Sequence, residues 1–266
     1  MIGSKGLKVF MCLTTNWELI CCLLLPMIGS MDWVLISTDH WVWDTTSGVY
    51  SCGYNRWGQL GQRYDDNKYE KPMILQINEN NDLIRDVSCG TYHTLVVTEN
   101  NNEVYGWGRN HFGQIGSRDT TCVDINTPEK IEFNDNYCFK SVHCFHNSSF
   151  ALTSDGQVFS WGLNSSNQLG LNCSDLILFR PQLICNLNGI TSIQSGGGQT
   201  YFSNSNKNEV YFCGQYYNEN VVAIDIQMIP KLIGNCKQFS DIQSIISYKW
   251  NKRTHFCSMD DMVYEV

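Results

Sequence analysis

Basic residues are scarce in this chain of 266 residues: 18 lysines and arginines stand against 26 acidic residues, for a formal net charge of −8. Nonspecific nucleic-acid binding depends on clustered lysine and arginine side chains. The one local basic group is Lys249, Lys252 and Arg253, which we interpret as a solvated loop. The sequence therefore predicts no direct binding of nucleic acid.

Long apolar runs are also missing. The apolar segment 21–28 is too short to cross a membrane, because a spanning helix needs about 20 apolar residues. Polar residues at 14–18 interrupt the continuous apolar core that a secretory signal requires. We therefore expect neither a membrane span nor secretion, and we expect the protein in the cytoplasm, the nucleus or both.

Metal and phosphate motifs are absent as well. No Cys-x-x-Cys pair occurs among the 13 cysteines, which also lack the spacing of a secreted disulfide framework. His143, Cys144 and His146 fall on an expected strand, where alternation sends neighbouring side chains to opposite faces. The glycines at 196–198 are not followed by the Lys-Ser/Thr of a phosphate loop. We predict no metal site, no cofactor and a reducing compartment.

What the chain does contain is a repeated motif. Its first copy is Val-Tyr-Ser-Cys-Gly-Tyr-Asn-Arg-Trp-Gly-Gln-Leu-Gly at 49–61, and related copies begin at Val104, Val158 and Val210. The fourth copy is degenerate, because Asn-Glu-Asn at 218–220 replaces the Gly-Gln-Leu-Gly ending. The valines recur every 52 to 55 residues as far as Val263. Such a period indicates one supersecondary unit repeated in a propeller or solenoid.

The repeat predicts the fold. Short β-type runs at even spacing, separated by glycine-rich turns and without helical periodicity, favour an all-β propeller of four-stranded blades. We expect one repeat domain at 1–266, with units at 1–48 (eroded), 49–103, 104–157, 158–209 and 210–262, and a further blade opening at 263–266. The residues assigned to the repeated scaffold are Gly53, Asn55, Gly58, Gln59, Gly61, Gly108, Asn110, Gly113, Gln114, Gly116, Gly162, Asn164, Gln168, Gly170 and Gly214.

Several positions of the repeat have expected structural roles. Asn167 stands where the first two copies carry glycine, which predicts a left-handed backbone. The apolar residue before the last glycine of each loop should fill space between blades; these residues are Leu60, Ile115 and Leu169. Trp107 and Trp161 should be buried, and Cys52 and Cys213, at the same position, should act as buried apolar residues.

The motif, together with the Val-Ser-Cys-Gly-x-x-His-Thr stretch at 87–94, resembles the repeat of the regulator-of-chromosome-condensation family. The resemblance covers about residues 49–215. It implies a β-propeller, commonly of seven blades of about 50 residues each. This chain has room for about five such blades, so we expect an incomplete ring: a fragment of a longer protein, an open arc, or a ring that a second chain completes.

His93 invites a catalytic reading because it follows Ser88 and Cys89. The equivalent positions in the next two copies are Ser148 and Gln199, and no nucleophile, base and acid recur at motif spacing. A buried polar contact to the loop is therefore the favoured interpretation. We predict no catalytic residue.

Function is expected from residues that differ between copies, because variable loops on a constant scaffold often carry binding sites. These candidate partner-binding residues are Arg56, Trp57, Arg109, His111, Phe112, Tyr216 and Tyr217. The alternative, that they are only solvated turn residues, stays open. Our first hypothesis is a non-enzymatic scaffold that binds another protein.

The resemblance adds two alternatives. The founding member of the family is a guanine-nucleotide exchange factor for a small GTPase, with an inserted hairpin that contacts the GTPase and a basic tail. The stretches at 62–80 and 117–134 are of ordinary length and mixed charge, so the sequence predicts no such hairpin. Some relatives carry a BTB domain after the propeller. The other alternative is therefore a substrate adaptor, of which this chain would be the N-terminal part.

Overall fold

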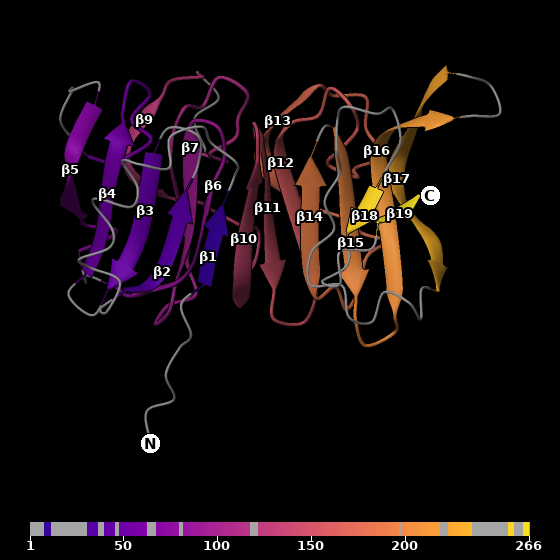
Figure 1. Ribbon diagram of the computed structural model, residues 1–266, viewed down its shortest axis with the longest axis horizontal. Coiled ribbons are helices and arrows are strands. Elements are labelled where there is room, and N and C mark those ends of the chain that lie inside the picture. The colour runs from indigo at the N-terminus through magenta and orange to yellow at the C-terminus, as the bar shows by residue number, and fades with distance from the viewer. Residues whose placement is uncertain are drawn as a thin grey trace.

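The structure is a computed structural model that describes residues 8–11, 31–36, 40–45, 48–62, 68–79, 82–117, 122–196, 198–218, 223–235, 255–257 and 263–265. The basic group Lys249, Lys252 and Arg253, the apolar segment 21–28 and Gly197 lie outside these residues. Figure 1 shows β-sheets standing side by side, from the sheet that contains β4 and β5 at one end to the sheet that contains β16 and β17 at the other. None of the described segments is a helix of the length and apolarity that a membrane crossing requires.

Four sheets have four consecutive antiparallel strands, which we call blades 1 to 4. Blade 1 consists of β2 (Met31–Ile36), β3 (His40–Thr45), β4 (Gly48–Tyr54) and β5 (Lys68–Leu75), with β1 (Lys8–Met11) added parallel to β2. Blade 2 consists of β6 (Ile84–Cys89), β7 (His93–Thr98), β8 (Val104–Gly108) and β9 (Ile125–Lys130).

Blade 3 consists of β10 (Phe139–Phe145), β11 (Ser148–Thr153), β12 (Val158–Leu163) and β13 (Ile177–Leu183). Blade 4 consists of β14 (Ser192–Gly196), β15 (Gln199–Asn204), β16 (Glu209–Asn218) and β17 (Ala223–Asn235). A separate pair is formed by β18 (His255–Cys257) and β19 (Val263–Glu265). The predicted all-β propeller architecture of four-stranded blades is confirmed.

The sequence motif begins at the third strand of each blade, not at the first. Val49, Val104, Val158 and Val210 lie at or next to the first residue of β4, β8, β12 and β16. Each predicted unit therefore combines the last two strands of one blade with the first two of the next. The glycine-rich loop of the motif connects the third strand to the fourth.

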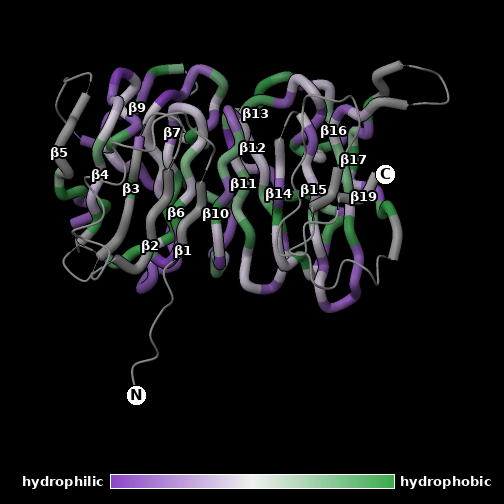
Figure 2. Tube along the Cα trace, in the orientation of Figure 1, coloured by the Kyte–Doolittle hydropathy of each residue, from purple (hydrophilic) through white to green (hydrophobic). Residues whose placement is uncertain are grey.

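The core lies between neighbouring blades. Trp107 of blade 2 packs with Val42 and Val49 of blade 1, and Trp161 of blade 3 packs with Leu95 and Val97 of blade 2. Blades 3 and 4 meet in the same way around Phe150 and Phe202, whose ring centroids are 6.1 Å apart. Figure 2 shows hydrophobic segments within the strands and hydrophilic segments in many of the turns. Each blade thus stabilises its neighbour by burying the apolar face of its sheet.

Polar side chains also join the first strands of neighbouring blades. The backbone N–H of Val142 donates to Asp86 Oδ2 at 2.9 Å, and that of Cys144 donates to Ser88 Oγ at 2.8 Å. These backbone groups on β10 therefore find partners on β6, outside their own sheet. The bonds fix the register between blades 2 and 3.

Blade 4 carries a longer hairpin than its neighbours. Where β8 ends at Gly108 and β12 at Leu163, β16 continues to Asn218 and pairs with β17 up to Asn218 opposite Ala223. Figure 1 shows the far ends of β16 and β17 projecting from the body of the molecule. This extension lies outside the stretches 62–80 and 117–134, for which the sequence predicts no inserted hairpin. The loss of the Gly-Gln-Leu-Gly ending in the fourth repeat coincides with this extension.

Candidate functional site

The loop after the third strand has the same internal hydrogen bonds in blades 1 to 3. Asn55 Oδ1 accepts the N–H of Leu60 at 3.0 Å, and Gln59 Oε1 accepts the N–H of Trp57 at 2.9 Å. The equivalent bonds in the next two blades join Asn110 to Ile115, Gln114 to Phe112, Asn164 to Leu169 and Gln168 to Ser166. These contacts support the assignment of the repeated asparagines and glutamines to the scaffold.

Each loop then docks on the next blade through one carbonyl oxygen. Gln114 O accepts hydrogen bonds from Trp161 Nε1 at 3.0 Å and from Ser149 Oγ at 2.6 Å. We call this contact between a loop and the next blade a joint. Gly116 lies at the same joint: its φ is +79°, and a Cβ there would lie 2.8 Å from Trp161 Nε1. Only glycine fits at that position. The other two joints use Gln59 O with Trp107 and Thr94, and Gln168 O with Cys213.

The predicted burial of the joint residues is confirmed. Leu60, Ile115 and Leu169 are fully buried, as are Trp107, Trp161 and Cys213. Asn167 has a φ of +56°, as its place in the repeat predicts. Burial raises the pKa of the Cys52 thiol to about 12 and also raises that of Cys213. Both thiols therefore stay neutral and act as apolar residues.

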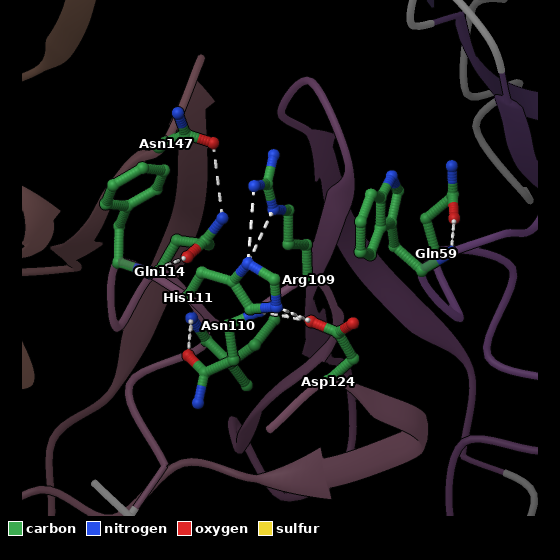
Figure 3. Close-up of polar contacts among 10 residues, drawn as sticks. Gln59, Arg109, Asn110, His111, Gln114, Asp124 and Asn147 are labelled. Atoms are coloured by element: carbon green, nitrogen blue, oxygen red, sulfur yellow. Dashed lines mark hydrogen bonds and ion pairs between the residues drawn. The ribbon is translucent and has the colours of Figure 1, made fainter. Parts of the chain in front are cut away.

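Five of the predicted partner-binding residues meet in one group, together with two that the sequence analysis missed. We call it the rim cluster, and its members are Arg56, Trp57, Tyr92, Arg109, His111, Phe112 and Asp124. They come from the loop between β4 and β5, the turn between β6 and β7, and the loop between β8 and β9. Figure 3 shows Arg109, His111 and Asp124 converging beside the scaffold residues Gln59 and Gln114. The cluster therefore spans the joint between blades 1 and 2.

Arg109 is surrounded by aromatic rings. Its Cζ atom lies 4.7 Å from the ring centroid of Trp57, 5.6 Å from that of Phe112 and 5.8 Å from that of Tyr92. All three distances fall within the range of cation–π attraction. Arg56 Cζ lies 5.2 Å from the same Trp57 ring. Two guanidinium groups therefore share one indole.

A short polar chain holds Arg109 in place. His111 Nδ1 accepts hydrogen bonds from Arg109 Nε and Nη2, both at 3.3 Å, and His111 Nε2 lies 3.4 Å from Asp124 Oδ1. Because Nδ1 acts as the acceptor, the ring hydrogen must be on Nε2, where it faces the carboxylate. Asp124 Oδ1 also accepts the backbone N–H of Asn110 at 3.1 Å. The dashed lines in Figure 3 follow this chain.

The chemistry of the rim cluster does not continue around the molecule. Ser165 and Ser166 occupy the positions of Arg56 and Trp57 in the third repeat, and Leu163 occupies the position of Arg109. The loop backbone is nevertheless the same. The arginines and aromatic rings are therefore not required for the loop to form.

Tyr216 and Tyr217 lie elsewhere. Both are on β16, paired with Asp225 and Ile224 of β17, and not in a loop. The ring centroid of Tyr216 is 5.9 Å from that of Phe212 within blade 4. Neither residue joins the rim cluster. Tyr92 and Asp124 are the residues that the sequence reasoning missed, although Tyr92 holds a position that varies, with Asn147 and Gly198 as its equivalents.

His93 makes a buried polar contact, as predicted. It is fully buried, and its Nε2 is 2.9 Å from Ser149 Oγ of the neighbouring blade instead of the expected loop. His40 holds the same position in blade 1, with Nε2 3.1 Å from Thr94 Oγ1. Burial lowers the pKa of His40 to about 3; burial and the nearby His40 lower that of His93 to about 3. Both rings are neutral at neutral pH.

Ligand-type residues do not converge on a metal position. Within the described ranges, no group of three or more His, Cys, Asp or Glu side chains could hold a metal ion. His143 instead pairs with Ser141 Oγ at 3.0 Å, and Cys144 Sγ donates to Ser88 O at 3.2 Å. His146 lies in the turn after β10 with a φ of +52°.

Comparison with protein families gives matches along most of the described chain. The family described as Regulator of chromosome condensation (RCC1) repeat matches residues 47–97, 101–152 and 155–202, which together make up more than half of the sequence. A second model with the same description matches residues 84–114. The matched segments contain all three complete copies of the motif.

Individual relatives match over part of their length. The chain is 36% identical over 176 residues to the probable E3 ubiquitin-protein ligase HERC6 of Homo sapiens, covering 65% of this chain and 16% of that protein. It is 39% identical over 124 residues to the X-linked retinitis pigmentosa GTPase regulator of Homo sapiens, covering 46% of this chain and 12% of that protein. The chain thus spans a small part of these relatives.

A solved structure supports the fold. Prp20p from Saccharomyces cerevisiae superposes with a TM-score of 0.62 at 19% sequence identity, covering 77% of this chain and 51% of that chain. At this identity the similarity concerns the fold alone. It agrees with the order of four-stranded sheets described above.

Proposed function

Because the chain belongs to the Regulator of chromosome condensation (RCC1) repeat family, we propose that it is a non-enzymatic scaffold that binds another protein through the rim cluster. The observation that carries this proposal is the gathering of two arginines, a tryptophan and a tyrosine at one joint. Trp, Tyr and Arg dominate the energy of protein interfaces. The scaffold residues do not require them, as the third loop demonstrates.

Photo-crosslinking tests this proposal. With p-benzoylphenylalanine at position 112, we expect a specific partner to be crosslinked in cells, and we expect Trp57→Ala to abolish the product. The matched control carries the same probe at Lys207, which is exposed in the turn between β15 and β16, at the opposite end of the strands. Equal crosslinking from both positions, or none from position 112, would contradict the proposal.

A substrate adaptor is the narrower form of this proposal. Its support is the relative named as a probable E3 ubiquitin-protein ligase, of which this chain covers 16%. In that form, the crosslinked partner would be a protein whose ubiquitination depends on this chain. We place this activity in the cytoplasm, the nucleus or both.

The projecting hairpin favours a second candidate, a guanine-nucleotide exchange factor. One relative bears the name of a GTPase regulator, and Prp20p is described by its binding properties to Gsp1p and histones. The hairpin of β16 and β17 extends beyond the blade, as a contact arm for a GTPase would.

An exchange assay with a panel of small GTPases tests this second candidate. It predicts that substoichiometric protein accelerates release of a fluorescent GDP analogue at least tenfold from one of them. A matched variant replaces residues 216–225 with an Asn-Gly turn between Gln215 and Ile226, which already pair, and it should lose the acceleration. If no GTPase responds, or if the shortened hairpin is equally active, this second candidate fails.

A further inference from the structure

We propose that the arginines of the rim cluster bind the carboxylate side chains of an acidic, extended segment of the partner protein. This inference rests on the proposed scaffold function and adds the chemistry of the partner. Its starting observation is that Arg56 and Arg109 both lie against the ring of Trp57, in the loops that follow the third strands of blades 1 and 2.

Neither arginine is neutralised by an acidic side chain among the described residues. Among them, Lys130 forms an ion pair with Glu103, and Asp124 lies against the ring nitrogen Nε2 of His111. Asp124 is the carboxylate of the rim cluster, and its Oδ1 contacts His111 and the backbone of Asn110, not Arg109. The rim cluster thus holds two arginines against one carboxylate, which makes it a local positive site in a chain with an excess of acidic residues.

The donors of Arg109 are only partly used. Nε and Nη2 both point to His111 Nδ1, and in Figure 3 the remaining guanidinium nitrogen points away from His111 and Asp124. Arg56 is exposed. Guanidinium groups bind carboxylates through charge-assisted hydrogen bonds, which are about twice as strong as neutral ones. The aromatic rings provide the apolar surface that such a segment would cover.

The size of the site favours a peptide over a nucleic acid. An extended peptide places alternate side chains on one face about 7 Å apart, so two acidic residues at alternate positions can address two neighbouring arginines. Tight binding of a nucleic acid depends on many phosphate contacts. The net charge of −8 opposes such a polyanion, whereas a short peptide meets only the local field of the rim cluster.

Peptide binding by the full chain tests the inference. The probes are fluorescent (Glu-Ser)4, its neutral match (Gln-Ser)4, a version with phosphoserine at the glutamate positions, and an eight-nucleotide oligothymidine. We expect (Glu-Ser)4 to bind at least tenfold more tightly than (Gln-Ser)4, and we expect R56Q and R109Q each to weaken this binding at least fivefold. R180Q removes an exposed arginine from β13, outside the rim cluster, and should leave the affinity unchanged.

Other outcomes overturn the inference. Equal binding of the glutamate and glutamine peptides, or equal loss with R180Q, would remove the role of the two arginines. Tenfold tighter binding of phosphoserine peptide would assign the site to phosphate, and comparable binding of oligothymidine would assign it to nucleic acid. Thermal unfolding of each variant separates loss of binding from loss of fold. Crosslinking from position 112 without acidic-peptide binding would leave the scaffold proposal standing and reject this inference alone.

Discussion

Trp161→Ala should lower the free energy of unfolding by about 3–5 kcal/mol, the usual cost of removing a fully buried large aromatic side chain. Trp161 is fully buried among residues of blades 2 and 3. Its indole N–H also donates to Gln114 O, which connects the two blades. The substitution therefore removes packing and a hydrogen bond from the same joint. Urea-induced unfolding, monitored by far-UV circular dichroism so that the signal does not depend on tryptophan fluorescence, measures the change in the free energy of unfolding.

Two matched variants separate these contributions. Trp161→Phe keeps an aromatic ring but removes the donor to Gln114 O, and it should cost less than Trp161→Ala. Trp57→Ala removes an aromatic residue from the partly exposed rim cluster, and its cost should stay below about 1 kcal/mol. Equal destabilisation by Trp57→Ala and Trp161→Ala would contradict the division between scaffold and rim.

Lowering the pH from 7 to 5 should destabilise the protein through His40 and His93. Both have a folded-state pKa of about 3, against 6.5 for an unperturbed histidine. Between these values the unfolded chain binds protons that the folded chain does not, so the free energy of unfolding falls as the pH falls. The contribution of the two neutral histidines to the free energy of unfolding is fully present above about pH 6.5. At pH 5 the expected loss is about 2 kcal/mol for each histidine.

His93→Gln isolates one of these groups, because blade 4 already carries glutamine at the same position, Gln199. The variant should lose about half of the destabilisation between pH 7 and pH 5. Urea midpoints at the two pH values, compared with those of the unsubstituted protein, give the result. An unchanged pH dependence in His93→Gln would show that His93 is not held neutral by burial.

The scaffold could be predicted from the sequence because it repeats. The recurring Gly, Asn and Gln residues have backbone roles that do not depend on the partner, as the bonds of Asn55 and Gln59 illustrate. Burial of Trp107 and Trp161 followed from their shared position. The sequence did not predict that the motif begins at the third strand of each blade. A period gives the length of a repeat but not the strand at which each sheet begins.

The rim cluster could be predicted only in part. Arg56, Trp57 and Arg109 stood out as variable residues within constant loops, but the sequence did not indicate that they meet. Tyr92 belongs to a different turn, and Asp124 lies 13 residues after His111. Their contacts depend on the packing of blade 1 against blade 2. The hairpin of β16 and β17 was missed because its sequence departs from the repeat where the extension begins.

The central claim is that the rim cluster binds the partner protein and that the repeated residues maintain the fold. Measuring both the stability and the partner crosslinking of Trp57→Ala tests this claim most directly. We predict an unfolding midpoint close to that of the unsubstituted protein and loss of the product crosslinked from position 112. A crosslinked product that persists in the variant, with the same partner and yield, would contradict a binding role for the rim cluster.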